Sequence, residues 1–166
     1  IEEGRKEWKR QRRRELIGMR SIDPMQAIER NTWFFLGSNS CEQMLYCLKR
    51  INDPSREHVG NNFSPVPISS IEPFLAMRDA VIILFERTEQ MLKENDFSLA
   101  DAIRTDSQSL QVSLSRHRKA MLDSMQDSST NLEAMLVFVN IIQESQELIG
   151  SLRHMIRGVV KFQDGE

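Results

Sequence analysis

Residues 130–162, TNLEAMLVFVNIIQESQELIGSLRHMIRGVVKF, are the stretch that decides the fold. Apolar residues recur along it at intervals of three, four and seven, which is the pattern of one helical face buried against a core. Thr130 is followed three residues later by Glu133, as in a capping box. The stretch therefore predicts one long amphipathic helix, whose apolar face carries Leu136, Val139, Ile142, Ile149, Leu152, Ile156 and Val160.

Three more segments repeat this spacing. Polar residues at 95–96 and at 127–129 separate them from one another and from the last helix, because such residues favour turns. The predicted helices are residues 24–51, with Ser21 or Asp23 as the cap and Pro24 in the first turn; residues 69–94, with Ser69 and Glu72 as a capping box; and residues 98–126, where Ser98 precedes Asp101.

The first of these helices is predicted to end at Asn52-Asp53-Pro54. The residue before a proline is sterically disfavoured in the helical conformation. Residues 54–68, PSREHVGNNFSPVPI, also hold two further prolines and the turn-forming Gly60-Asn61-Asn62. The sequence therefore predicts a loop here.

The fold class follows from these segments. No run alternates apolar and polar residues as a strand would. Long helices joined by short turns become antiparallel neighbours. A chain of 166 residues that is 40% hydrophobic, with a net charge of −2, is globular in character. We predict an all-α fold, an up-down antiparallel four-helix bundle over residues 21–166, with a basic helical arm in residues 1–20 before it.

The arm differs in charge from the rest of the chain. Its twenty residues hold eight Lys or Arg and four Glu, whereas the remainder holds 14 basic and 20 acidic residues. A basic helix beside a membrane is attracted to anionic lipid, and we favour this interpretation over a solvated helix extension. The interrupting Glu residues disfavour nucleic acid. The candidate membrane-surface residues are Lys6, Lys9, Arg10, Arg12, Arg13 and Arg14.

Two observations concern the setting of the chain. Ile1 is not Met and opens a charged helical stretch, so we expect an excised piece of a larger protein. Cys41 and Cys47 are six residues apart on one predicted helix, which puts them on different faces and too far apart to form a disulfide. A reduced, cytosolic setting is expected.

The sequence offers little for catalysis. None of His58, His117 and His154 lies at a defined spacing from a Ser or Cys nucleophile, and no phosphate-binding Gly-rich loop is present. We predict a non-enzymatic chain without a cofactor. Helical carboxylates in a bundle can hold a di-metal site, and the candidates are Glu42 with Glu144 or Glu147, although surface carboxylates are the more ordinary interpretation.

Two segments resemble the helices of the PhoU family. The last helix, from Asn131 through Glu147-Leu148-Ile149-Gly150 to Ile156, is similar to the second half of a PhoU domain, and residues 39–46 give a related segment. The resemblance implies Glu147 and Glu42 as metal ligands. Ser151 and Tyr46 stand where the family has a second carboxylate, Asp, which would weaken metal binding.

A second resemblance lies around the predicted loop. Residues 48–54, LKRINDP, and residues 57–63, EHVGNNF, look like a stretch of bacterial Pit-type inorganic phosphate transporters, which carry a PhoU-like cytoplasmic domain after their membrane helices. The similarity covers roughly residues 30–160. It implies a non-catalytic regulatory or coupling domain of a phosphate permease, on the cytoplasmic face of the inner membrane.

The same resemblance implies the partners. They are the membrane-embedded part of the same transporter and a second copy in a homodimer, with inorganic phosphate as the transported substrate and no nucleic acid. A free-standing PhoU-like signalling adaptor that binds metal or partner proteins is the alternative function, and a metal-dependent bundle enzyme is a third.

Two groups are candidate partner-binding residues. His58, Asn61 and Asn62 lie in the predicted loop, which is either a simple crossover or a docking surface. Trp33, Phe34 and Phe35 are consecutive, so they cannot all face one core. Either the basic arm folds over them or they form a subunit contact. No cluster of Arg residues is predicted to converge on phosphate, because Arg116, Arg118 and Lys119 are spaced to spread.

Overall fold

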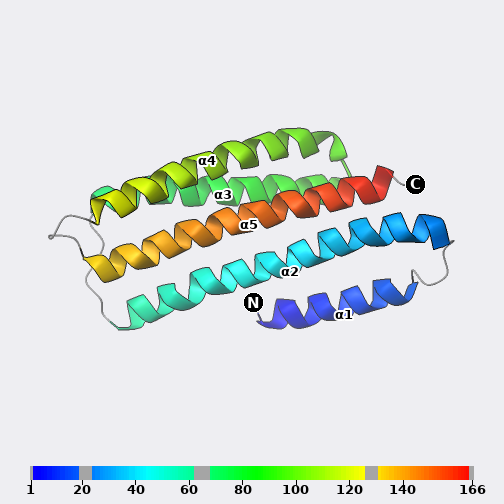
Figure 1. Cartoon of the computed structure of the whole chain (residues 1–166), viewed down its shortest axis with the longest axis horizontal. Coiled ribbons are helices and arrows are strands. Elements are labelled where there is room, and N and C mark those ends of the chain that lie inside the picture. The colour runs from blue at the N-terminus through cyan, green and yellow to red at the C-terminus, as the bar shows by residue number, and fades with distance from the viewer. Residues whose placement is uncertain (1, 19–23, 62–67, 126–130, 165–166) are drawn as a thin grey trace.

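The computed structural model describes residues 2–18, 24–61, 68–125 and 131–164, and these residues are helical apart from the short turns. No strand occurs among them, so the all-α prediction is confirmed. The elements are α1 (Glu2–Gly18), α2 (Pro24–Gly60), α3 (Ile68–Glu94), the short 3-10 helix η2 (Phe97–Leu99), α4 (Ala100–Ser124) and α5 (Leu132–Asp164) (Figure 1).

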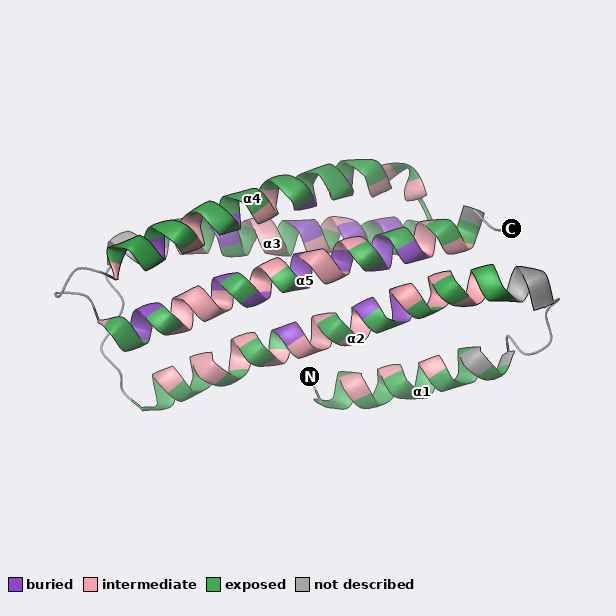
Figure 2. Cartoon of the chain, viewed as in Figure 1, coloured by how far each residue is buried: buried purple, intermediate pink, exposed green. Residues whose placement is uncertain are grey.

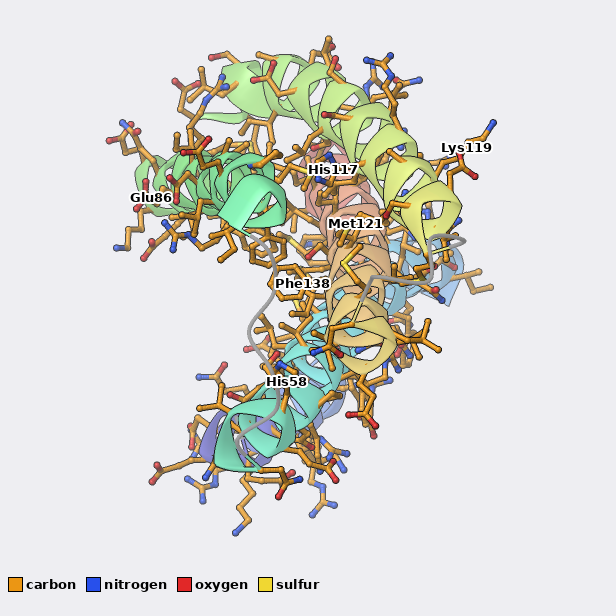
Figure 3. The ribbon with its side chains drawn as sticks, turned by 90° about the vertical axis from the view of Figure 1, so that its left-hand side faces the viewer. His58, Glu86, His117, Lys119, Met121 and Phe138 are labelled. Carbon is orange, nitrogen blue, oxygen red and sulfur yellow. The ribbon has the colours of Figure 1, made fainter. Side chains whose placement is uncertain are left out.

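Helix α5 lies at the centre of the arrangement. It packs against α2 on one side and α4 on the other, α3 lies beside α4, and α1 runs along α2 (Figure 1). Consecutive helices run in opposite directions. However, α2 and α3 pack mainly against other helices rather than against each other, and the end-on view shows them on either side of an opening backed by α5 (Figure 3). The described helices form an open arc.

The core is built from buried residues that repeat every seven positions, all of them apolar except Ser107, whose hydroxyl donates to the Ile103 carbonyl. Buried residues run along α5 and along the sides of α2 and α3, whereas α4 is exposed over most of its visible face (Figure 2). A seven-residue repeat keeps one side of a helix facing its neighbours over several turns. The repeats are Met77, Leu84 and Met91 on α3, Ser107, Leu114 and Met121 on α4, and Ile142, Ile149 and Ile156 on α5.

Helices α2 and α5 approach closely where Gly37 faces Gly158. A Cβ atom built on Gly158 would lie 2.8 Å from the backbone nitrogen of Gly37 and 2.9 Å from the carbonyl oxygen of Trp33. Only a residue without a side chain allows the two backbones to approach this closely. Gly158 therefore fixes the spacing of the two helices at this point.

The predicted helix end at Asn52-Asp53-Pro54 is wrong. Helix α2 continues through Pro54 to Gly60, so residues 54–60 are not a loop. A proline inside a helix leaves the carbonyl four residues earlier without its N–H donor, here the carbonyl of Arg50. The side-chain amide of Asn140 on α5 donates to that oxygen at 3.1 Å. A neighbouring helix thus supplies the hydrogen bond that the proline removes.

This replacement makes a testable prediction for Asn140→Ala. We expect a loss of about 1 kcal/mol in the free energy of unfolding, measured by urea denaturation, because the Arg50 carbonyl loses its donor. In a Pro54→Ala background the backbone N–H of residue 54 returns to that carbonyl, so the same Asn140→Ala change should cost much less. Equal costs in both backgrounds would contradict the exchange of donors.

The helix caps differ in detail from the prediction. Asn95, with φ 55°, follows the end of α3, and Asp96 caps the 3-10 helix η2, since its carboxylate accepts the Ser98 backbone N–H at 3.1 Å. Helix α4 itself follows Leu99, which makes no side-chain cap hydrogen bond, so the predicted cap Ser98 lies inside η2. Asn131 caps α5 through its side-chain oxygen, which accepts the Ala134 N–H at 3.3 Å. The other predicted caps, Thr130, Ser21 and Asp23, lie outside the described residues. Helix α3 begins at Ile68, one residue before the predicted cap Ser69.

Candidate functional site

A cavity of about 660 Å³ lies between the first half of α4 and the second half of α5. Neutral residues on its walls include Ala100, Gln111, Gly150, Ile156 and Val160. Its charged or titratable side chains are Asp101 and Arg104 from α4, and Arg153, His154, Arg157 and Lys161 from α5. Four permanent cations and one carboxylate therefore share one cavity, so its potential is positive.

The helical repeat explains why α5 brings its basic residues together. Arg153, Arg157 and Lys161 are spaced by four, which places them along one side of the helix. Because α4 runs antiparallel to α5, its first turns meet the last turns of α5 (Figure 1). Arg104 is added to the row in this way, although about fifty positions separate it from Arg153 in the sequence.

Arg153 is held in place by a polar network between the two helices. Its Nη1 donates to Oε1 of Gln111 at 2.9 Å, and Nε2 of Gln111 donates to the carbonyl of Gln146 at 3.2 Å. The Gln146 amide in turn donates to the hydroxyl of Ser115 at 2.6 Å. The Nε atom of Arg153 is buried and has no hydrogen-bond partner. A guanidinium held in place in this way is suited to binding an anion.

The other arginines of the cavity keep much of their donor capacity. Arg104 forms an ion pair with Asp101 at 3.1 Å in which both side chains are largely exposed, and such pairs are weak. The guanidinium of Arg157 lies 5.6 Å from the centre of the Trp33 ring, a contact through its face that leaves its N–H groups available. The cavity can therefore bind an anion through several charge-assisted hydrogen bonds.

The prediction that no Arg cluster converges missed this cavity. Arg116, Arg118 and Lys119, the group weighed in the sequence, do not line it. One signal was available, since basic residues recur every four positions from Arg153 to Lys161. The sequence alone could not show that Arg104 joins them, because that depends on which end of α4 faces α5.

Of the two metal candidates that the resemblance implies, Glu42 is paired with the basic arm in the structure. The Glu42 carboxylate accepts from Arg12 of α1 at 3.3 Å, and the guanidinium of Arg5 lies over the Tyr46 ring at 4.4 Å. Glu147 is exposed on α5, and Ser151 is half-buried. Across the part of the chain that is described, no group of three or more His, Cys, Asp or Glu side chains is placed to hold a metal ion. Glu42 and Tyr46 hold the basic arm against α2.

Glu144, the other carboxylate considered, is buried and accepts from Nε of Arg50 at 2.7 Å. This hydrogen bond raises the pKa of Arg50. The two cysteines are free thiols, as their spacing predicted, and burial raises the pKa of Cys41 to about 11. The Cys41 thiol is therefore protonated and unreactive at neutral pH.

Trp33, Phe34 and Phe35 point in different directions, as expected for consecutive residues. Trp33 and Phe34 are half-buried, and Phe35 is 37% exposed. The guanidinium of Arg12 lies 5.8 Å from the centre of the Phe35 ring. The basic arm therefore folds back over this part of α2, which is one of the two arrangements that the sequence left open.

The predicted docking loop is partly helix. His58 is half-buried and Asn61 is exposed, where the backbone N–H of Asn61 closes the last turn of α2 on the carbonyl of Glu57 at 3.0 Å. Asn62 lies outside the described residues. In Figure 3, His58 lies at the end of α2, far from α4. His58 and Asn61 therefore lie at the end of a helix, and their role in partner binding stays a prediction.

The basic arm divides its residues between two sides. Arg5, Trp8 and Arg12 are half-buried against α2, whereas the other five candidates, Lys6, Lys9, Arg10, Arg13 and Arg14, are exposed. Arg12 is thus part of the contact with α2 and does not share the outer face. Within the described residues, no helix is both long enough and apolar enough to cross a membrane.

Comparison of the chain with protein-family models, with curated proteins and with solved structures finds no match.

Proposed function

We propose that this chain is a non-catalytic coupling domain of an inorganic phosphate transporter, on the cytoplasmic face of the membrane, and that the cavity between α4 and α5 binds phosphate. The observation that carries the proposal is the gathering of Arg104, Arg153, Arg157 and Lys161 around one cavity. The similarity of residues 48–63 to Pit-type transporters supports the choice of phosphate among small anions.

The arrangement supports a mechanical role. In the proposal, helices α2–α5 act as a PhoU-like four-helix bundle under the membrane-embedded part of the transporter, and α1 faces the lipid. Five basic side chains lie on the exposed side of α1, and clusters of this kind are attracted to anionic headgroups. An anion between α4 and α5 would draw two helices together, because it contacts cations on both. Binding would then change helix packing, which the membrane part senses.

The alternative, a free-standing adaptor that binds metal, is less well supported. Its ligands would be Glu42 and Glu147, and the Glu42 carboxylate is already paired with Arg12. A metal ion would have to displace this guanidinium and detach part of α1 from α2. No comparable displacement is needed for an anion in the cavity.

The proposal is tested by titrating the chain with inorganic phosphate in a calorimeter. We expect saturable binding, and we expect the double variant Arg104→Gln/Arg157→Gln to raise the dissociation constant tenfold or more. Each charge-assisted hydrogen bond contributes roughly 1.5–3 kcal/mol, and one such bond accounts for a tenfold change. Both side chains are exposed, so the fold should be unaffected.

A matched control removes the same charge elsewhere on α4. The double variant Arg116→Gln/Lys119→Gln changes two exposed cations outside the cavity and should leave the dissociation constant unchanged. The absence of binding by the unmodified chain, or equal weakening in both double variants, would show that the cavity is not a phosphate site.

A further inference from the structure

Helix α3 carries a second, exposed apolar stripe besides the one that faces the core. Its residues are spaced alternately by three and four, as in a coiled-coil seam. Leu75, Ile82 and Leu92 are 38%, 47% and 38% exposed, values unusual for three large apolar residues on one side of a helix. We call the complete row the α3 seam; besides these three residues it holds Phe85, which is half-buried and also packs against the core, and the exposed charged residues Arg78 and Glu89.

The α3 seam borders an apolar groove. The opening between α3 and α2 in Figure 3 is backed by α5, and one pocket there is lined by Met44 of α2, Phe85 and Leu92 of α3, and Leu152 of α5. Phe138 of α5 contacts α3 from this side, where its ring centre lies 4.7 Å from that of Phe74. Phe85, Glu89 and Leu92 line both this pocket and the α3 seam, so the two surfaces are continuous.

The α3 seam is complementary to itself when a second copy of α3 lies antiparallel to it. With the symmetry axis between Ile83 and Leu84, Leu75 faces Leu92 of the other copy and Ile82 faces Phe85. The same register places Arg78 of one copy beside Glu89 of the other, so a positive side chain meets a negative one. Every apolar residue of the seam then meets an apolar residue, and each charge meets its complement.

From this complementarity we infer that two copies of the chain associate through their α3 seams, as an antiparallel pair of helices. A C2 interface of this kind buries the same patch on both copies. The inference does not depend on the proposed function, because it rests on α3 alone. It places the subunit contact on α3 rather than on Trp33 to Phe35, which α1 and α5 partly cover.

The charged layer selects one arrangement. A parallel pair would set Arg78 against Arg78 and Glu89 against Glu89, and shifting the antiparallel pair by one heptad would place Arg78 against Ile82. Charges at seam positions select orientation and register in this way. The present partners of these residues, Asp79 for Arg78 and Lys93 for Glu89, form exposed pairs that exchange at little cost.

Acidic residues flank the seam without closing it. Asp79 and Glu86 are exposed beside it, and Figure 3 shows Glu86 pointing outward from α3. At the solvated edge of such an interface, like charges contribute little compared with the central layer. The register of the dimer is therefore set by Arg78 and Glu89 rather than by these flanking carboxylates.

Charge reversal tests the interface by light scattering. The unmodified chain is expected to have the mass of two chains. Arg78→Glu alone sets Glu against Glu, and Glu89→Arg alone sets Arg against Arg, so each single variant should raise the dimer dissociation constant by about tenfold or more. The double variant Arg78→Glu/Glu89→Arg restores opposite charges and should dimerise like the unmodified chain.

Mixing the two single variants provides the sharpest outcome. Arg78→Glu chains present two acidic residues and Glu89→Arg chains two basic ones, so an equimolar mixture should form a heterodimer that is tighter than the homodimer of either variant. Circular dichroism checks that each variant is folded. Arg116→Glu changes an exposed residue of α4, away from the seam, and is the control that should leave the mass in solution unchanged. A monomeric unmodified chain, or dimers that survive both single reversals, would overturn the inference.

Discussion

Gly158→Ala is expected to lower the free energy of unfolding by about 2 kcal/mol. The new Cβ would lie 2.8 Å from the Gly37 nitrogen and 2.9 Å from the Trp33 carbonyl oxygen, and both atoms are backbone. A backbone cannot move aside as the end of a flexible side chain can, so α2 and α5 must separate locally. These are the two most extensively packed helices, and the loss spreads along their contact.

The sign of this effect makes it diagnostic. Gly→Ala inside a helix ordinarily stabilises by roughly 0.5–1 kcal/mol. Gly150→Ala on the same helix is the matched control, since its Cβ would lie 3.4 Å from only the side-chain nitrogen of Gln111. Urea denaturation of both variants should give a clear loss for Gly158→Ala and little change or a gain for Gly150→Ala. A gain at both positions would show that α2 and α5 are not in close contact at Gly158.

Ile149→Ala is expected to cost about 3 kcal/mol. Ile149 is fully buried at the middle of α5, where the side chains of the neighbouring helices meet. Truncation removes three carbon atoms from the core and leaves a cavity that the long, regular helices around it cannot collapse to fill. Against a typical total stability of about 5–15 kcal/mol, this is a large fraction.

Leu136→Ala on the same helix is the control for Ile149→Ala. Leu136 is 51% exposed, although it belongs to the apolar face that the sequence predicted for this helix. Its truncation should change the free energy of unfolding by less than about 1 kcal/mol. Similar losses at Leu136 and Ile149, measured by the same denaturation, would contradict the orientation of α5.

The sequence predicted the helices because their signals are local. Apolar residues at helical spacing along residues 130–162 define α5, and the turn at Asn95 and Asp96 separates α3 from α4, as expected. The interpretation of Pro54 failed because it used a local rule. The donor that keeps α2 helical, Asn140, is far away in the sequence and reaches Arg50 only in the folded chain.

The sequence predicted less of the candidate site than of the helices. The row of Arg153, Arg157 and Lys161 on α5 is visible in the spacing, but Arg104 joins it only because α4 runs antiparallel to α5. Glu42, which the family resemblance suggested as a metal ligand, is instead paired with Arg12. That pairing depends on α1 folding back along α2, an arrangement that the sequence left open.

What the sequence by itself determined is the set of long amphipathic helices, since a helix is specified by spacing and capping within one segment. The tertiary structure decided how these helices meet. The contact of Gly37 with Gly158 sets the spacing of α2 and α5, and the open side beside α3 leaves its seam exposed. Both depend on packing between distant segments, where steric fit of backbones and pairing of charges, rather than local pattern, select the arrangement.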